Sequence, residues 1–195
     1  MTPTMIRVIP FSFVCVWTAF SQVVPSLPSG QTVIDSSWGF SFSCPQGYIT
    51  RRSELDLYRV FVGPQVDVFK GFVYSVITAQ QHFKYMPDQV PKYTSSSDTA
   101  RLIALSIVDM VHHIKTAESN VEIHTDSVTE RRTDSGLRVF VIYQTEDVDS
   151  FSGERDIFHD DPFYLVAFPM RGDLVFIKFE DNIWDIVRTT RLVSR

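Results

Sequence analysis

The stretch from 162 to 180, PFYLVAFPMRGDLVFIKFE, constrains the fold of this chain more than any other. It is apolar at odd and even positions alike on both sides of Arg171-Gly172-Asp173, a sequence that suits a tight turn because glycine takes positive φ at little steric cost. Successive side chains of a strand point to opposite faces, so the stretch predicts a central hairpin buried on both faces. We expect Pro169, which has no backbone N–H, to end the ladder of the first strand.

The segments around this hairpin predict an α+β fold with a mainly antiparallel central sheet flanked by helices. Apolar residues at i, i+4, i+7, i+8 and i+11 from Ile103 predict a long helix from Ser97 or Asp98 to about Ala117. A second apolar stripe predicts a terminal helix over 182–193, and one helical turn is expected around 83–86. Further strands are expected at 38–44, 48–50, 55–62, 66–79, 121–129 and 137–145. The acidic stretch 146–161 is interpreted as a loop.

The first residues have the layout of a secretory signal peptide. Arg7 precedes an apolar run, and Ala19 and Ser21 are small residues at the −3 and −1 positions for cleavage before Gln22. We therefore divide the chain into a signal peptide (1–21), a linker rich in proline and serine (22–32) and a single domain (33–195). The alternatives are that the apolar start is a buried strand or an uncleaved anchor.

This division predicts an exported protein, secreted or periplasmic, with no membrane span after cleavage. Cleavage would leave Cys44 as a lone cysteine, which cannot form an internal disulfide and is expected to be a small buried hydrophobe. A hydrophobic content of 44% and a charged content of 21% are typical of globular proteins. The net charge of −5 and the lack of a basic stripe argue against a nucleic-acid partner.

Three segments resemble the fold shared by the PsbP photosystem proteins and the Mog1 Ran-binding proteins. Residues 39–48, GFSFSCPQGY, look like the opening strand and its Pro-x-Gly-aromatic turn. Residues 126–145 are similar to the middle hairpin, and residues 163–193 to the closing strand pair and helix. The resemblance implies an αβα sandwich and a noncatalytic binding or assembly role, and it transfers no functional residue to this chain.

The acidic stretch is the candidate metal site of the sequence, because carboxylates at alternate positions suit a hard cation. An EF-hand starting at Asp147 is excluded, since Ser152 stands where glycine is required and Phe158 where a bidentate glutamate is required. A looser calcium or zinc site remains a hypothesis. Its candidate ligands are Asp147, Asp149, His159, Asp160 and Asp161.

The other histidines show no metal-binding pattern. His112 and His113 are adjacent, so on a helix they diverge by about 100° and cannot share an ion as ligands at i and i+4 do. His82 and His124 have no motif around them, and all of these are interpreted as solvated surface histidines. The Arg171-Gly172-Asp173 triplet, which integrins read in some extracellular proteins, is explained by the hairpin turn alone.

No catalytic motif occurs, so the catalytic residues are unknown and no cofactor is predicted. The sequence favours an exported noncatalytic domain that binds an unidentified protein partner. Two alternatives stay open: a metal-dependent (Ca or Zn) hydrolase that uses the 147–161 stretch, and a small-molecule carrier with its ligand between the sheet and the long helix.

Overall fold

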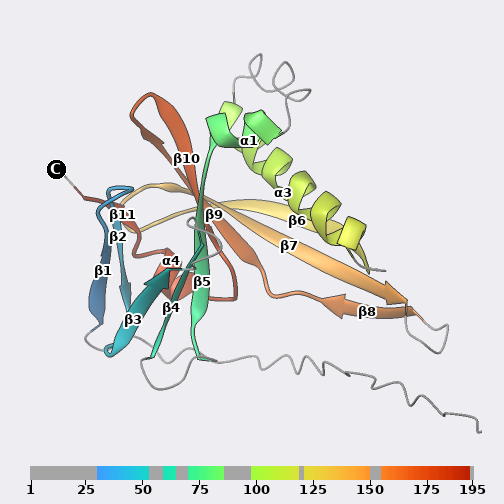
Figure 1. Ribbon diagram of the computed structural model, residues 1–195, viewed down its shortest axis with the longest axis horizontal. Coiled ribbons are helices and arrows are strands. Elements are labelled where there is room, and N and C mark those ends of the chain that lie inside the picture. Colours follow the sequence, from blue (N-terminus) through green and yellow to red (C-terminus); the bar gives the residue numbers. More distant parts are fainter. Residues whose placement is uncertain are drawn as a thin grey trace, which may run out of the picture.

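A computed structural model (Figure 1) describes residues 30–52, 59–64, 70–85, 98–118, 121–149 and 155–193. The signal peptide and most of the linker predicted from the sequence lie outside these residues. The helices are α1 (Ala79–Tyr85), α3 (Thr99–Glu118) and α4 (Trp184–Val187). The strands are β1 (Gln31–Asp35), β2 (Phe40–Cys44), β3 (Tyr48–Arg52), β4 (Arg59–Pro64), β5 (Phe72–Thr78), β6 (Val121–Arg132), β7 (Arg138–Asp149), β8 (Arg155–His159), β9 (Phe163–Met170), β10 (Asp173–Phe179) and β11 (Arg191–Leu192).

These strands form two sheets, and each described pair is antiparallel. The large sheet has the order β3-β4-β5-β10-β9-β7-β6, with β8 added to β7, and the small sheet has the order β1-β2-β11. The predicted hairpin is β9–β10, which lies in the middle of the large sheet. Arg171 and Gly172 form its two-residue turn with φ of 50° and 81°, as a type I′ turn requires.

Pro169 does not end the ladder, contrary to the prediction, because β9 continues to Met170 and Pro169 pairs with Leu174. The alternation of the backbone explains this result. Ala167 pairs with Arg138, the first residue of β7, and Pro169 has the same orientation two residues further on. The nitrogen of Pro169 therefore faces the β7 edge of β9 at a point beyond the first residue of β7. No carbonyl of β7 lies opposite it, so the missing N–H costs no hydrogen bond of the ladder.

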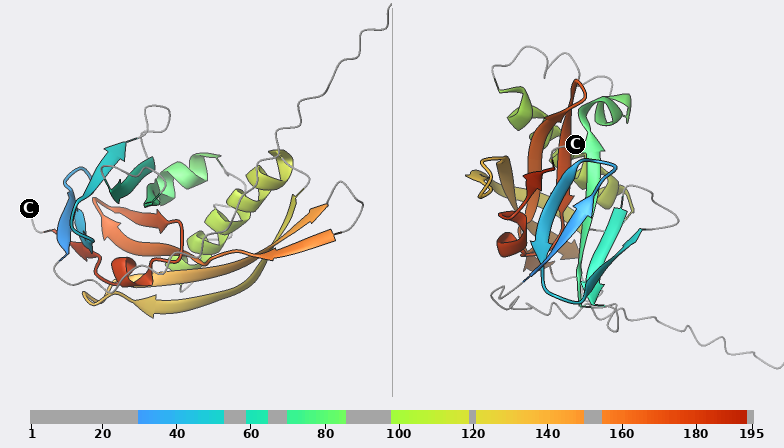
Figure 2. Two further views of the ribbon diagram at one scale, coloured as in Figure 1. Left: turned by 90° about the horizontal axis from the view of Figure 1, so that it is seen from below. Right: turned by 90° about the vertical axis from the view of Figure 1, so that its left-hand side faces the viewer.

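Both faces of β9–β10 are buried, as predicted, and each face contributes to a different part of the core (Figure 2). Phe163, Leu165 and Phe176 pack with Ile103 and Ile107 of α3. The opposite face packs with the small sheet and α4, in a cluster that includes Phe40, Phe42, Tyr74, Val166, Phe168, Ile177, Phe179 and Ile186. The α+β class with an antiparallel sheet is confirmed. The finer description as an αβα sandwich is not, because a three-stranded sheet and one short helix cover the second face.

A buried polar contact joins the small sheet to the large one. The Asp35 side chain is buried, accepts a hydrogen bond of 3.0 Å from the Tyr74 hydroxyl and lies 3.3 Å from the Arg52 guanidinium. Burial of the ring, followed by the charge of Asp35, raises the pKa of Tyr74. Tyr74 also contacts Phe40 and Phe42 edge to face, with ring centroids 5.6 Å apart in both pairs. Polar and aromatic contacts thus fix the same side chain.

Two further predictions of secondary structure differ from what the structure shows. The stretch 146–161 is not a loop throughout, since β7 extends to Asp149 and β8 occupies Arg155–His159. The terminal helix over 182–193 is reduced to α4, because residues 191–192 instead pair with β2 as β11. In the part of the chain that the structure describes, α3 included, no helix is long and apolar enough to cross a membrane.

The hairpin turn provides a test of backbone strain without a steric clash. A Cβ on Gly172 would meet no atom within 4 Å, but its φ of 81° disfavours every residue with a side chain. We expect Gly172→Ala to lower the free energy of unfolding by about 1–2 kcal/mol, and Gly172→Asn by less, since asparagine tolerates this conformation better. Urea denaturation measures the stability of both variants. Equal stability of Gly172→Ala and the native protein would contradict a positive φ at Gly172.

Candidate functional site

The sequence-predicted ligands lie on a projection that we call the strand arm: residues 121–126 of β6, residues 143–149 of β7, and residues 155–161, which are β8 and the two residues after it. Both β6 and β7 have 12 residues, but β7 pairs with β9 only from Arg138 to Ile142. Beyond that point β8 takes the place of β9 along β7, from Thr145 to Asp149. The arm therefore extends away from the small sheet and the central hairpin (Figure 1).

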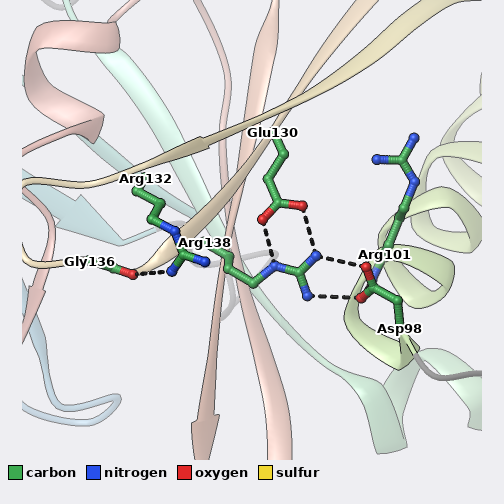
Figure 3. Close-up of polar contacts among 6 residues, drawn as sticks. All are labelled: Asp98, Arg101, Glu130, Arg132, Gly136 and Arg138. Carbon is green, nitrogen blue, oxygen red and sulfur yellow. Dashed lines mark hydrogen bonds and ion pairs between the residues drawn. The ribbon is translucent and has the colours of Figure 1, made fainter.

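An ion-pair cluster fixes the opposite ends of β6 and β7 to α3 (Figure 3). The Arg138 guanidinium donates to both oxygens of Asp98, at 2.8 and 2.9 Å, and to both oxygens of Glu130, at 2.8 Å each. Asp98 also accepts from the backbone N–H of Arg101, as the predicted N-cap of α3. Hydrogen bonds from Arg138 lower the pKa of Asp98 to about 2, and the two carboxylates raise the pKa of Arg138.

One face of the arm packs on α3. Ile123 is buried on this face, and the His112 ring of α3 contacts the Gln144 side-chain amide and, at 3.2 Å, the Thr125 hydroxyl. Because strand neighbours alternate, residues 122, 124, 145 and 147 point to the other face. The helix therefore supports one face of the arm, and the face that carries these four residues points away from it.

That second face brings together three potential metal ligands: Glu122, His124 and Asp147. Glu122 and His124 are two residues apart on β6, and Asp147 lies directly opposite Glu122 on β7. One ligand atom from each lies within 4.8 Å of the others. His124 Nε2 is 3.9 Å from Glu122 Oε1. Two carboxylates and an imidazole suit zinc, whose bonds of about 2 Å would require the side chains to move slightly closer.

The predicted ligands divide in the structure. Asp147 belongs to the three-residue cluster. His159 lies opposite Thr145 on the same face, and its Nδ1 is 3.3 Å from the Thr145 hydroxyl, which also donates to Asp126. Asp160 donates its backbone N–H to the carbonyl of Gln144, and Asp161 is exposed after the strand ends. The side chain of Asp149 lies outside the described residues. The prediction of a metal site is not tested by these positions.

Sequence reasoning missed Glu122 and His124. The available signal was their spacing, since Glu-x-His on a strand places both side chains on one face. Their approach to Asp147, however, depends on the register of β6 against β7, which passes through a bulge between Thr125 and Ser127.

Two histidines are not the solvated residues that the sequence predicted. His82 is 1% exposed, and its Nε2 lies 2.6 Å from the Ser106 hydroxyl, where α1 meets α3. Burial lowers the pKa of His82, so the ring stays neutral. His112 contacts the arm, as described above. His124 and His159 are exposed as expected.

The remaining candidates offer no paired acid and base. Cys44 is fully buried, as predicted, and burial raises its pKa to about 11, so its thiol is a poor nucleophile. A shallow depression of about 240 Å³ lies between the β9–β10 turn and the small sheet, where its walls include Trp38, Phe168 and Met170. Arg171 is the one charged side chain among its lining residues.

Comparison with known proteins identifies the fold. No family model matches the chain, and no curated protein matches it. The fold is similar to the solution structure of cyanobacterial PsbP (CyanoP) from Synechocystis sp. PCC 6803, with a TM-score of 0.50 and 12% sequence identity over 89% of this chain and 98% of that chain. The predicted PsbP-like fold is therefore confirmed.

The Asp98–Arg138 pair should make stability depend on pH in acid. The folded-state pKa of Asp98, about 2, lies below the ordinary value of 3.8. The contribution of the ion pair to the free energy of unfolding is therefore present above about pH 4 and is lost as the pH falls through 2. Asp98→Asn keeps a capping side chain but removes the charge. We expect it to lower the free energy of unfolding by up to about 1 kcal/mol at pH 7, because the pair is partly exposed, and by much less near pH 2.

Urea denaturation at several pH values measures this difference. Asp109→Asn is the matched control, since Asp109 is an exposed carboxylate further along the same helix. A difference between Asp98→Asn and the native protein that stays constant from pH 7 to pH 2 would contradict a role for the ion pair.

Proposed function

We propose that this chain is an exported, noncatalytic binding or assembly domain that acts through protein–protein interaction. The observation that carries the proposal is the strand arm, which combines adjacent exposed hydrophobic residues with a dense set of carboxylates. Ile157 is 64% exposed and Phe158 is 53% exposed. The two side chains lie on opposite faces of β8, so a partner that covers this strand would bury apolar surface on both of its sides. The PsbP-like fold supports the proposal at the level of architecture.

The packing of the core supports binding at the surface over binding of a ligand inside. The space between α3 and the sheet is filled by buried side chains, among them Ile103, Ile107, Phe140 and Phe176. A small-molecule carrier would need that space. In the titratable cluster of the strand arm Glu122 and His124 are more than half exposed, so bulk water screens the charges that hydrolytic catalysis would use.

Site-specific photo-cross-linking in the source organism tests the proposal. A photoreactive residue replaces one exposed hydrophobic at a time, at Phe158, Ile34, Ile49 or Leu192, and the cells are fractionated before analysis. We expect a discrete cross-link to another protein from at least one position, in a fraction outside the cytosol, with a mature N-terminus near Gln22. Recovery of intact cytosolic protein without a cross-link from any position would overturn the proposal.

A divalent cation bound by Glu122, His124 and Asp147 is the second candidate, favoured by their approach on one face. Titration calorimetry with zinc and calcium measures it directly. We expect His124→Ala to weaken zinc binding at least about tenfold. His159→Ala, which removes an exposed histidine of the same face, should leave it unchanged. Equal losses in both variants, or no heat of binding in the native protein, would contradict the site.

A further inference from the structure

β8 has an outer edge that no described strand covers. β8 pairs with β7 from Arg155 to His159, and β9 takes over the same edge of β7 from Phe163 onward. β10, which flanks β9, reaches only to Phe179 opposite Tyr164. Within the residues that the structure describes, the other side of β8 thus faces no strand, and it lies at the rim of the strand arm (Figure 1).

The register shows which backbone groups this edge presents. The N–H of Asp160 donates to the carbonyl of Gln144, in line with the register that pairs His159 with Thr145. In an antiparallel ladder such hydrogen-bonded pairs alternate with pairs whose N–H and C=O groups point away from each other. The N–H and C=O groups of Arg155, Ile157 and His159 therefore point outward, away from β7, in the spacing that an added strand requires.

The side chains of β8 do little to block such an addition. Natural edge strands are commonly protected by lysine or proline, or by a bulge. β8 has no lysine and no proline, and its charged residues Arg155 and Asp156 stand at its start. At its middle it places exposed Ile157 and Phe158, on opposite faces, and its pairing with β7 has no register shift. An added strand would cover apolar surface on both sides.

Charge indicates what kind of strand fits. The strand arm contains eight carboxylates and one arginine, Arg155. The carboxylates are Glu122, Asp126, Glu146, Asp147, Asp149, Asp156, Asp160 and Asp161. A second copy of the chain would bring two such acidic arms together, which is unfavourable. A segment with cationic side chains between apolar ones is complementary.

We propose that a basic, extended segment of a partner protein adds as a strand to the outer edge of β8. The inference rests on the proposed function and deepens it: backbone hydrogen bonds to Arg155, Ile157 and His159 supply the pairing, Ile157 and Phe158 supply apolar contact, and the carboxylates of the arm select a cationic sequence.

Synthetic peptides test this proposal on the full chain. The probe is Lys-Ile-Lys-Val-Lys-Ile-Lys, with Glu-Ile-Glu-Val-Glu-Ile-Glu as the charge-reversed control. Lys-Pro-Lys-Pro-Lys-Pro-Lys is the second control, since it keeps the charge but cannot form a strand. Amide hydrogen exchange by NMR is read at Arg155, Ile157 and His159. We expect the Lys-Ile peptide alone to slow exchange at these three amides, because the amides of Asp156 and Phe158 already bond to β7.

The variants Ile157→Lys and Ile34→Lys change the net charge equally, at residues with exposures of 64% and 60%. We expect Ile157→Lys to weaken the binding of the Lys-Ile peptide at least about fivefold and Ile34→Lys to leave it unchanged. Equal binding of the proline peptide, which would mean attraction by charge alone, overturns the proposal. So does equal binding of the acidic peptide, or protection of the three amides without peptide, which would mean self-association.

The two proposals fail separately. A cross-linked partner that contacts the chain only at Ile34, Ile49 or Leu192 would leave the protein-binding function intact and overturn strand addition. Peptide binding at β8 without any cross-linked partner in the source organism would instead overturn the proposed function.

Discussion

Burial of both faces of the β9–β10 hairpin is the constraint on which the rest of the structure depends. A hairpin that is apolar on both faces needs cover on both sides, and this chain supplies two different covers. On one side α3 packs along the sheet through Ile103 and Ile107. On the other, a small sheet carries the rings of Phe40 and Phe42 into the core. Hydrophobic burial is non-directional, so either kind of layer satisfies it.

The long strands β6 and β7 relate this core to function. Their first use is structural, because β7 continues the large sheet next to β9. Their second role is to extend past the end of β9 and pair with β8, which places a polar surface at a distance from the core. Arg138 lies at the start of β7 and binds Asp98 and Glu130, which ties the root of β6 and β7 to the helix that also supports the arm. The position of the surface is thus set by ion pairs at one end and by packing on α3 along one face.

The sequence predicted what depends on local pattern. Continuous apolar character identified β9 and β10 and the faces of Leu165 and Val166, and periodicity with a capping residue identified α3. The predictions failed where the structure of a segment depends on contacts with residues that are distant in the sequence. β8 lacks a polar–apolar alternation because it is exposed on both faces, so its acidic neighbours suggested a loop. His82 is buried only because α1 meets α3, a contact that no local signal reports.

The candidate ligands show the same division. Asp147 was recognised because carboxylates stand at alternate positions in the sequence around it. Glu122 and His124 were not recognised, because they are far from Asp147 in the sequence and come close to it only through the pairing register of β6 and β7. For the same reason the outer edge of β8 was not foreseen: it exists because β9 leaves β7 after Ile142, which is a property of the sheet and of no single segment.

The small sheet has a consequence for the order of events during synthesis. β2 pairs on one side with β1 and on the other with Arg191 and Leu192 of β11, and Val193 donates to the carbonyl of Gly39. β2, which is synthesised early, therefore cannot pair on this side until β11, about 150 residues later in the sequence, has been synthesised. Phe40 and Phe42 also wait for the rings of Phe168 and Phe179, and this closure over a long stretch of sequence favours slow folding. During that interval the nascent chain remains accessible to chaperones and to any machinery that threads extended polypeptides.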